Sequence, residues 1–415
     1  MIKSLAPVAA LLISVSILLT GQGLQGTLLP VRASLEQFST VSIGVMGAAY
    51  FLGFTIGCLN GGELVRRVGH VRVFLAMSAL ASAAPLLHGL VIQSLVWGAL
   101  RMLTGFCFAV LYIVIESWLN ERSSNENRGI VFSTYAMITL TVMAAGQMMT
   151  LLYDPFGLQL FVVASVLVSI GAVPVALSRS PIPEQPQTVA IDIKRLFQIS
   201  PSGAIGCLVA GLTNGAFWGL AAVFATSLGD DISLAAWFMT AAVIGGAVGQ
   251  WPLGILSDAI GRRKVLIGVS LAGASVGLAL FLLAPILKFL TANLLGVFWG
   301  ALAFPLYTIA VAYSNDFADP GEYVTVSSGL LLMYGIGATI GPFLASTLMT
   351  WQDAGGLFLF TSFTHATLVA YVAIRFVRRR NHAEQQIAFG DALSAAQTAS
   401  QVYEEEILPQ LSVDD

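Results

Sequence analysis

Two short loops rich in glycine and basic residues share one pattern in this chain. The first runs from Gly62 to Arg72 as GELVRRVGHVR, and the second runs from Gly254 to Lys264 as GILSDAIGRRK. Their offset is 254 − 62 = 192 residues. Glycine permits a tight turn with positive φ, and the basic side chains beside it bind anionic groups such as lipid phosphates. A basic turn repeated between apolar segments is typical of a duplicated membrane transporter.

The second loop carries an acid at a position where the first loop does not. Asp258 ends an apolar segment and is expected to pair with Arg262, with Arg263 or with a neighbouring helix N-terminus. Simple anchoring at a lipid surface needs no acid, so a role beyond anchoring is favoured for this copy. Arg66 replaces the acid in the first copy, where anchoring alone is favoured unless Glu116 or Glu121 supplies the missing partner.

A further charge lies inside an apolar segment. Arg101 falls about 10 Å into the segment 94–118, at 1.5 Å per residue. A cation at that depth costs several kcal/mol unless it is paired or faces water. Arg101 therefore either binds an anionic group of a substrate or extends its side chain outward to the membrane surface, and the first role is favoured.

Acidic residues are absent from the middle of every apolar segment, since Glu63 and Glu116 both lie close to segment ends. Any proton coupling must therefore use an off-centre carboxylate such as Glu116. His88 and His365 fall in the third and twelfth segments, where packing is favoured over proton transfer. The sequence contains no nucleotide-binding loop, metal cluster or nucleophile constellation, so it predicts neither enzyme activity nor a cofactor.

The elements that position these residues are predicted to be membrane spans. Hydrophobic residues make up 57% and charged residues 10% of the 415 residues, whereas a soluble domain carries about 25% charge. Segments of about 20 apolar residues cross a bilayer core of roughly 30 Å. The pattern predicts an all-α integral membrane protein with twelve spans, at residues 5–29, 40–62, 73–92, 94–118, 130–152, 157–177, 203–228, 233–256, 265–287, 289–313, 326–350 and 355–377.

The distribution of Lys and Arg predicts the orientation of these spans. Nearly all of the 19 basic residues lie on one side if the N-terminus is inside the cell. We therefore expect a multi-pass protein of the inner membrane with both termini in the cytoplasm. The first segment could be a signal peptide cleaved near residues 31–34, but cleavage would turn the other spans against this bias, so retention is favoured.

The two parts of the chain match beyond the loops. Leu111-Tyr112 aligns with Leu306-Tyr307, and Asn120 aligns with Asn315, both at an offset of 195. We expect two six-helix halves joined by a Pro-rich charged linker. The expected parts are a first half at 1–178, a cytoplasmic linker at 179–202, a second half at 203–378 and an acidic cytoplasmic tail at 379–415.

Equivalent faces of equivalent helices should meet a cavity between the halves. Amide and aromatic residues on such faces suit a neutral polar or amphipathic solute, and Arg101 would admit an anion. The alternative for each residue is an interhelical hydrogen bond. The candidates for substrate binding besides Arg101 are Gln22, Gln25, Asn214, Trp218, Tyr112, Tyr307, Gln147 and Tyr135.

The chain resembles the major facilitator superfamily over about residues 5–378. The second loop is similar to the signature loop of that family, whereas the first departs from it at Arg66 and His70. The fourth span resembles the second motif of the family through Arg101, Gly105 and Ala109. The finer resemblance is to a poorly characterised bacterial branch near the sugar and drug transporters.

The resemblance carries expectations about the fold and the gate. It implies twelve helices in two pseudo-symmetric halves that move a small organic solute by alternating access. It also implies that the signature loops latch a cytoplasmic gate, and that Arg101 has a third possible role at a proton site, as in drug antiporters. The gating residues expected on this basis are Gly254, Asp258, Gly261, Arg262, Arg263, Gly62, Arg67, Gly69 and Glu116.

Proton symport of a polar or anionic metabolite is slightly preferred over efflux of drugs or metabolites. An antiporter-like motif at Gly337, Gly341 and Pro342 lies in the eleventh span instead of the fifth, which weakens the efflux assignment. A membrane sensor or partner-binding protein without transport is a third alternative. We expect a monomer whose partners are a small-molecule solute, protons and the lipid bilayer, with no nucleic acid.

Overall fold

The computed structural model of the chain describes residues 8–123, 128–177, 192–229, 232–319 and 322–378, without the side chains of residues 128, 129, 324 and 376–378. The expected tail and most of the expected linker lie outside these ranges. Within them, every regular element is a helix. The predicted all-α fold class is confirmed.

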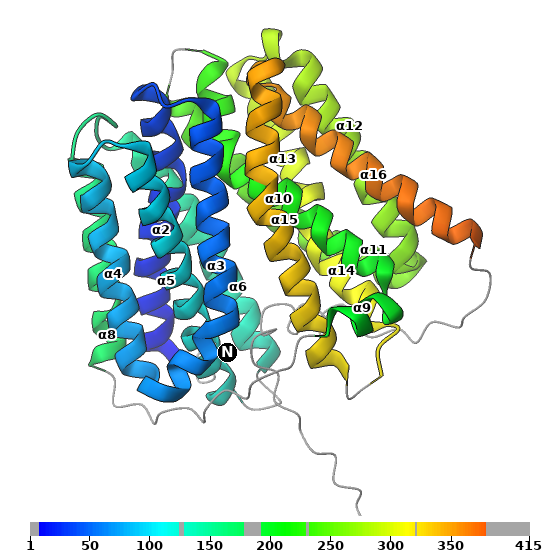
Figure 1. Cartoon of the computed structure of the whole chain (residues 1–415), viewed down its shortest axis with the longest axis horizontal. Coiled ribbons are helices and arrows are strands. Elements are labelled where there is room, and N and C mark those ends of the chain that lie inside the picture. The colour runs from blue at the N-terminus through cyan, green and yellow to red at the C-terminus, as the bar shows by residue number, and fades with distance from the viewer. Residues whose placement is uncertain (1–7, 124–127, 178–191, 230–231, 320–321, 379–415) are drawn as a thin grey trace, which may run out of the picture.

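The helices form two groups that lie side by side (Figure 1). The first group contains α2 (Ala9–Leu35), α3 (Thr40–Val68), α4 (His70–Leu90), α5 (Ser94–Glu121), α6 (Arg128–Met148) with η2 (Met149–Leu151), and α7 (Gln159–Gly171) with α8 (Val173–Ala176). We refer to this group as the first half.

The second half begins after α9 (Ile193–Ile199), a short helix at the edge of the bundle (Figure 1). It contains α10 (Pro201–Ser227), α11 (Ser233–Ile260), α12 (Arg262–Leu283) with η3 (Ala284–Ile286), α13 (Phe289–Ala303) with α14 (Pro305–Asn315), α15 (Tyr323–Trp351) and α16 (Gly356–Arg378).

Twelve helical spans in the described ranges are long and apolar enough to cross a membrane, as the sequence predicts. The first span continues to Leu35 instead of ending near residue 29, and the second continues to Val68 instead of ending near residue 62. Arg32 holds the extension of the first span because it forms an ion pair with Glu36 at 2.6 Å and donates to the Pro155 carbonyl at 2.7 Å. A partnered arginine can lie 7% exposed at the end of a span, which composition alone does not reveal.

The two repeated loops form the same turn. Gly69 separates α3 from α4 with φ of 97°, and Gly261 separates α11 from α12 with φ of 94°. Only glycine adopts such backbone angles without strain, so each glycine ends one helix and starts the next. The sequence repeat is therefore a structural repeat.

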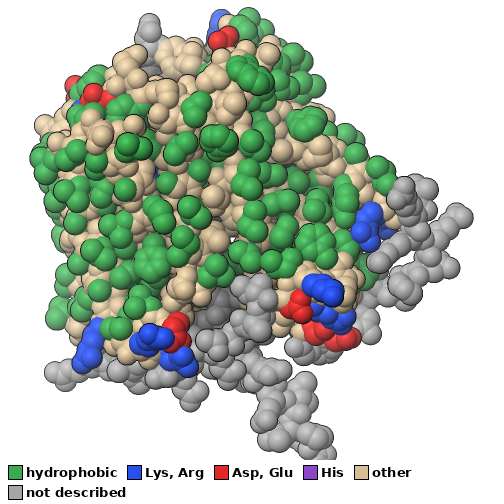
Figure 2. Space-filling model, viewed as in Figure 1, with side chains coloured by type: hydrophobic (Ala, Val, Ile, Leu, Met, Phe, Trp, Pro, Cys, Tyr) green, Lys and Arg blue, Asp and Glu red, His purple; other side chains and the backbone are tan. Residues whose placement is uncertain are grey.

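Charged side chains gather at the two ends of the bundle, and an apolar belt covers the visible face between them (Figure 2). One end carries most of the basic residues, and we name it the basic face; the other end is the opposite face. The described basic residues at the basic face are Arg66, Arg67, Arg72, Arg122, Lys194, Arg195, Arg262, Arg263, Lys264 and Arg375. An apolar belt of this kind is the surface that lipid covers.

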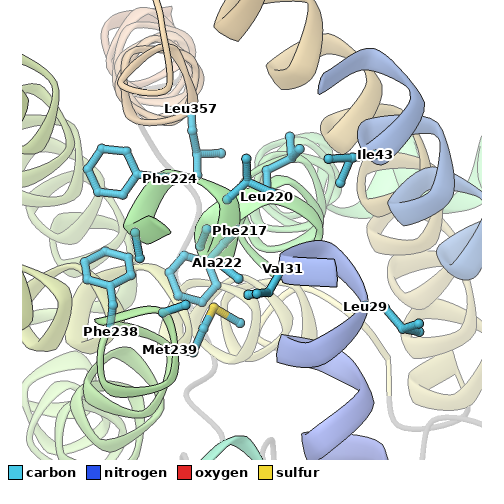
Figure 3. Packing of buried hydrophobic residues seen from close by; sticks show 14 of the residues in the cluster. Leu29, Val31, Ile43, Phe217, Leu220, Ala222, Phe224, Phe238, Met239 and Leu357 are labelled. Carbon is cyan, nitrogen blue, oxygen red and sulfur yellow. The ribbon is translucent and has the colours of Figure 1, made fainter. Parts of the chain in front are cut away.

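The hydrophobic cores show where the halves join. Near the opposite face, one buried cluster contains residues of both halves, including Val31 and Ile43 of the first and Leu220 and Met239 of the second. Figure 3 shows these side chains pointing toward one another from α2, α3, α10 and α11. Near the basic face, each half has a separate cluster of its own. The halves are thus fused at the opposite face and separate toward the basic face.

Small residues allow the close approach at the fused end. A Cβ atom added to Gly47 of α3 would lie 3.1 Å from the Gly219 Cα of α10 and 3.2 Å from the Pro342 Cβ of α15. A larger side chain at this point would push the halves apart, because these atoms are already at van der Waals contact.

Candidate functional site

A hydrogen-bonded group joins α2, α3 and α5 near the middle of the bundle. Gln22 Nε2 donates to Tyr50 Oη at 2.7 Å, and Tyr112 Oη donates to Gln22 Oε1 at 3.0 Å. Gln22 and Tyr112 are partly exposed although each lies well inside a membrane-spanning helix. These side chains therefore line a space inside the bundle.

Arg101 belongs to the same group. Its guanidinium carbon lies 4.2 Å from the centroid of the Tyr50 ring, a cation–π contact. Arg101 and Tyr112 are 112 − 101 = 11 residues apart, about three helical turns, so they share one face of α5. Arg101 is partly exposed, and no hydrogen bond or ion pair joins its guanidinium to another described residue. The structure thus places this cation in the interior group and not at the membrane surface.

Glu116 is an interior carboxyl further along α5. It forms a hydrogen bond with the Tyr135 phenol of α6. It also interacts electrostatically with Tyr112 of the first half and Tyr307 of the second half. Glu116 lies about 22 Å along the helix from Arg101, at 1.5 Å per residue. The hydrogen-bond partner of Glu116 among the described residues is thus a phenol. The arginines of the first basic loop pair with Glu63 and not with Glu116.

A matching aromatic group lies in the second half. The rings of Tyr307 on α14 and Tyr334 on α15 meet edge to face, with 4.9 Å between their centroids. The Asn214 amide of α10 forms a hydrogen bond with the Tyr334 phenol. Tyr334 also interacts electrostatically with Tyr50. The second polar group therefore lies within electrostatic range of the first, across the boundary between the halves.

Three other candidates have partners outside these two polar groups. Trp218 stacks on Phe304, with 5.6 Å between ring centroids. Gln25 is buried and donates to the Gly21 carbonyl of its own helix at 3.3 Å. Gln147 is buried and accepts a hydrogen bond from Thr240 of α11 at 3.2 Å, which links the halves near the opposite face.

The second basic loop contains a charge cluster around Arg262. Arg262 is 1% exposed; its Nη2 lies 3.3 Å from Asp258 Oδ1, and its Nε lies 3.2 Å from Asp316 Oδ2 at the end of α14. The side chain of Asp258 is 41% exposed and that of Asp316 is 3% exposed. Arg263 donates to the Val372 carbonyl of α16 at 3.3 Å. The loop thus joins α11, α12, α14 and α16, and Gly254 lies buried one turn before Asp258.

The first basic loop uses different residues at the same turn. Glu63 forms ion pairs with Arg66 and Arg67, the second at 2.5 Å, and all three side chains are partly or largely exposed. His70 occupies the position of Arg262, since 262 − 70 = 192, and its Nε2 lies 3.1 Å from Ser117 Oγ of α5. Arg66 occupies the position that Asp258 has in the second loop. The acid of the first loop is Glu63 instead. At Gly62, an added Cβ would meet no atom within 4 Å.

An ion pair fastens α9 to the start of α15. Arg195 donates to Glu322 through Nε at 2.7 Å and through Nη2 at 3.1 Å. Both groups lie outside the membrane spans, and the hydrogen bond from Arg195 holds the pKa of the Glu322 carboxyl below its usual range. Leu196 of α9 is buried, and a Cβ on Gly329 of α15 would lie 3.0 Å from it. The end of the expected linker is thus a helix bound to the second half.

Sequence reasoning missed four residues of these clusters, namely Tyr50, Tyr334, Glu63 and Asp316. A tyrosine within an apolar span does not reveal whether it faces the interior or the lipid. Asp316 directly follows Asn315, which aligns with Asn120, and this adjacency was the available signal for an acid beside the second loop. In the described part of the chain, no group of three or more His, Cys, Asp or Glu residues is arranged to hold a metal ion.

Comparisons with known proteins agree with this architecture. The model of the Major Facilitator Superfamily matches residues 11–200 and 203–408. The chain is similar to the uncharacterized MFS-type transporter YcaD of Escherichia fergusonii, with 28% identity over 387 residues, 92% of this chain and 98% of the relative. YcaD of Escherichia coli O7:K1 is 26% identical over the same length and coverage.

Solved structures show the same fold at low sequence identity. The nucleoside transporter NupG superposes with a TM-score of 0.76 at 14% identity, over 89% of this chain and 99% of that chain. A bacterial homolog of the human lysosomal transporter Spinster, in an inward-facing and occupied conformation, gives a TM-score of 0.68 at 15% identity, over 89% and 95% of the two chains.

Proposed function

Because the chain belongs to the major facilitator superfamily, we propose that it moves a small polar or anionic metabolite across the membrane by alternating access. The observation that carries this proposal is the polar centre between the halves. Arg101 and Gln22 face it from the first half, and Tyr334 faces it from the second. Interior polar groups in a membrane protein are costly unless they serve a ligand, an ion or a partner.

The arrangement of the buried hydrophobic clusters supports a state in which the space between the halves is open on one side. The shared cluster closes the space at the opposite face, and the separate clusters leave the halves unjoined at the basic face. By the positive-inside rule, the basic face is cytoplasmic. We therefore assign an inward-facing state in the inner membrane, with both termini in the cytoplasm.

Proton coupling is assigned to Glu116. Among the described residues inside the bundle, it is the carboxyl that lies beside Tyr135 and interacts electrostatically with Tyr112 and Tyr307. A carboxyl in such surroundings is able to exchange protons as water reaches or leaves it. Symport follows if the proton and the solute enter the centre from the same side.

The test is uptake by the purified full-length protein in liposomes. A library of metabolites is offered with and without an imposed pH gradient, and internal solute and external pH are both followed. Symport predicts that an acidic exterior drives accumulation and that solute entry alkalinises the exterior. Efflux antiport, the second candidate, predicts that an acidic exterior expels preloaded solute. Binding without flux in either direction would instead indicate a sensor.

A further inference from the structure

The two halves meet near the opposite face along two different seams. On one seam, α3 of the first half packs on α15 of the second, and a Cβ on Gly47 would lie 3.2 Å from the Pro342 Cβ. On the other seam, α6 of the first half packs on α11 of the second. There Thr240 Oγ1 donates to Gln147 Oε1 at 3.2 Å, and the Ala144 carbonyl is a second acceptor for it at 3.5 Å. The first seam is thus apolar, and the second is polar.

Gln147 and Pro342 occupy equivalent positions in the two halves. They are 342 − 147 = 195 residues apart, which is the offset that relates other residues of the two halves. A glycine precedes each of them, and a Cβ on Gly146 or on Gly341 would collide with a carbonyl oxygen of α2 or of α10, respectively. The same local packing therefore places a proline at one seam and an amide at the other.

The polar seam is closed to water. Gln147 is 0% exposed and Thr240 is 6% exposed. One end of the Gln147 amide accepts the hydrogen of Thr240, but the other end, Nε2, has no hydrogen-bond partner among the described residues. A buried hydrogen bond stabilises a contact modestly, whereas a buried donor without a partner opposes the contact, because that donor has lost its bond to water. Closure of this seam therefore makes one bond and leaves one group unpaired, and the two effects are of similar size.

We infer that Gln147 and Thr240 form a weak latch at the opposite face, whose hydrogen bond is offset by the unpaired amide hydrogen beside it. Closure of the seam makes the bond, and opening admits water to the amide hydrogen. This seam therefore favours neither state strongly. The inference rests on the proposed alternating access, since it names the bond that must break when the centre opens to the opposite side.

The test measures how often the opposite face opens in intact cells. The three native cysteines are replaced by serine, and Gly26→Cys introduces one thiol on α2, where an added Cβ meets no atom within 4 Å. A membrane-impermeant maleimide is added outside the cells, on the side to which the positive-inside rule assigns the opposite face. The alkylation rate of this thiol follows the population that is open on that side, even when that population is small.

Two variants of the latch are expected to act in opposite directions. Thr240→Val keeps the shape of the side chain but leaves both ends of the Gln147 amide unpaired, so alkylation should become at least about tenfold faster. Gln147→Met removes the whole amide and fills its space, while Thr240 keeps the Ala144 carbonyl as its acceptor. Alkylation of that variant should become several-fold slower. The double variant also has no unpaired amide and should behave like Gln147→Met.

Thr361→Val is the matched control for the loss of a buried hydroxyl. Thr361 is 0% exposed, and its hydroxyl donates to the Phe358 carbonyl of its own helix. This variant should leave the alkylation rate unchanged. All variants are first shown to reach the membrane in equal amount. An unchanged rate in Thr240→Val, or rates that change in the same direction in Thr240→Val and Gln147→Met, would overturn the latch.

Flux assays of the same variants in liposomes separate the latch from transport. Opposite effects on alkylation without flux of any metabolite keep the latch and reject transport. Flux that continues while the alkylation rates of the variants do not differ keeps transport and rejects the latch.

Discussion

At the scale of single residues, the protein places few charges inside the bundle and gives each a specific neighbour. Arg101 lies on an aromatic ring, and Glu116 lies beside a phenol. Each contact reduces the cost of burial without neutralising the charge, since neither neighbour is an ion of opposite sign. The two groups therefore keep their capacity to bind an anion and a proton.

Replacing the interior acid tests the coupling role. Glu116→Gln keeps the shape and hydrogen-bonding capacity of the side chain but removes the exchangeable proton. Accumulation driven by a pH gradient should fall by more than about tenfold, while exchange of labelled for unlabelled solute at equal pH should continue. The measurement is uptake and counterflow in liposomes. Glu121→Gln, at an exposed end of the same helix, is the control, and gradient-driven uptake that survives in Glu116→Gln would reject the assignment.

At the scale of elements, the two repeated turns differ in the partners that surround them. The second loop buries Arg262 against Asp316, whereas the first loop exposes its ion pairs and buries His70 against Ser117. Buried ion pairs are strongly coupled to the packing of the helices around them, and exposed pairs are screened by water. The second loop therefore holds the helices of its half in a fixed arrangement.

The two acids beside Arg262 should behave differently. Asp316→Asn leaves a buried arginine without its buried partner and should destabilise the protein by about 3–5 kcal/mol. Asp258→Asn changes a side chain that is 41% exposed and should cost about 1 kcal/mol or less. Thermal unfolding in detergent measures stability, and spin-label distances across the basic face measure the separation of the two halves. Equal effects of the two variants would contradict this division.

The ion pair between Arg195 and Glu322, which holds α9 against α15, should depend on pH. Because Arg195 lowers the pKa of Glu322, the pair contributes stability above the ordinary glutamate pKa of about 4.3 and loses it as pH falls through the lowered value. Glu322→Gln should reproduce the low-pH state at neutral pH. Hydrogen exchange of residues 194–199 should then become several-fold faster, while Glu121→Gln should leave it unchanged. Exchange that is equally slow in both variants would assign the anchoring of α9 to Leu196 alone.

At the scale of the whole molecule, the structure is a pair of bundles joined at one end. The shared cluster near the opposite face contains large aromatic and aliphatic side chains, while the contact between α3, α10 and α15 relies on Gly47, Gly219 and Pro342. Small residues let the backbones of these helices approach closely, so the seam is closed in this structure. Parting of the halves at this seam would open the polar centre to the opposite side of the membrane.

A larger side chain at Gly47 should shift the protein away from the state that is closed at the opposite face. Gly47→Leu places a side chain where a Cβ alone would lie 3.1 Å from Gly219, so closure at the opposite face becomes unfavourable. Spin labels at Gln37 and Gln352, introduced after the native cysteines are replaced by serine, should report longer distances across that face. Gly98→Leu on α5, where an added Cβ meets no atom within 4 Å, is the control. Identical distance distributions in the two variants would show that this contact does not set the state.

The sequence by itself determined the number of spans, the helical class and the equivalence of the two basic turns. Hydropathy and glycine placement are local properties, and the bilayer imposes them on any chain that crosses it. It also singled out Arg101, Glu116, Tyr112 and Tyr307, because charges and repeats stand out in apolar segments.

Only the tertiary structure decided which of these residues meet. Tyr50 and Tyr334 look like ordinary span residues in the sequence, and only the packing of the helices places Tyr50 against Arg101 and Tyr334 against Tyr307. Gln25 and Gln147 look as suitable as Gln22, yet rotation about the helix axes points them into packed contacts. The direction of a side chain depends on how helices from distant parts of the chain pack together, and no single segment encodes that arrangement.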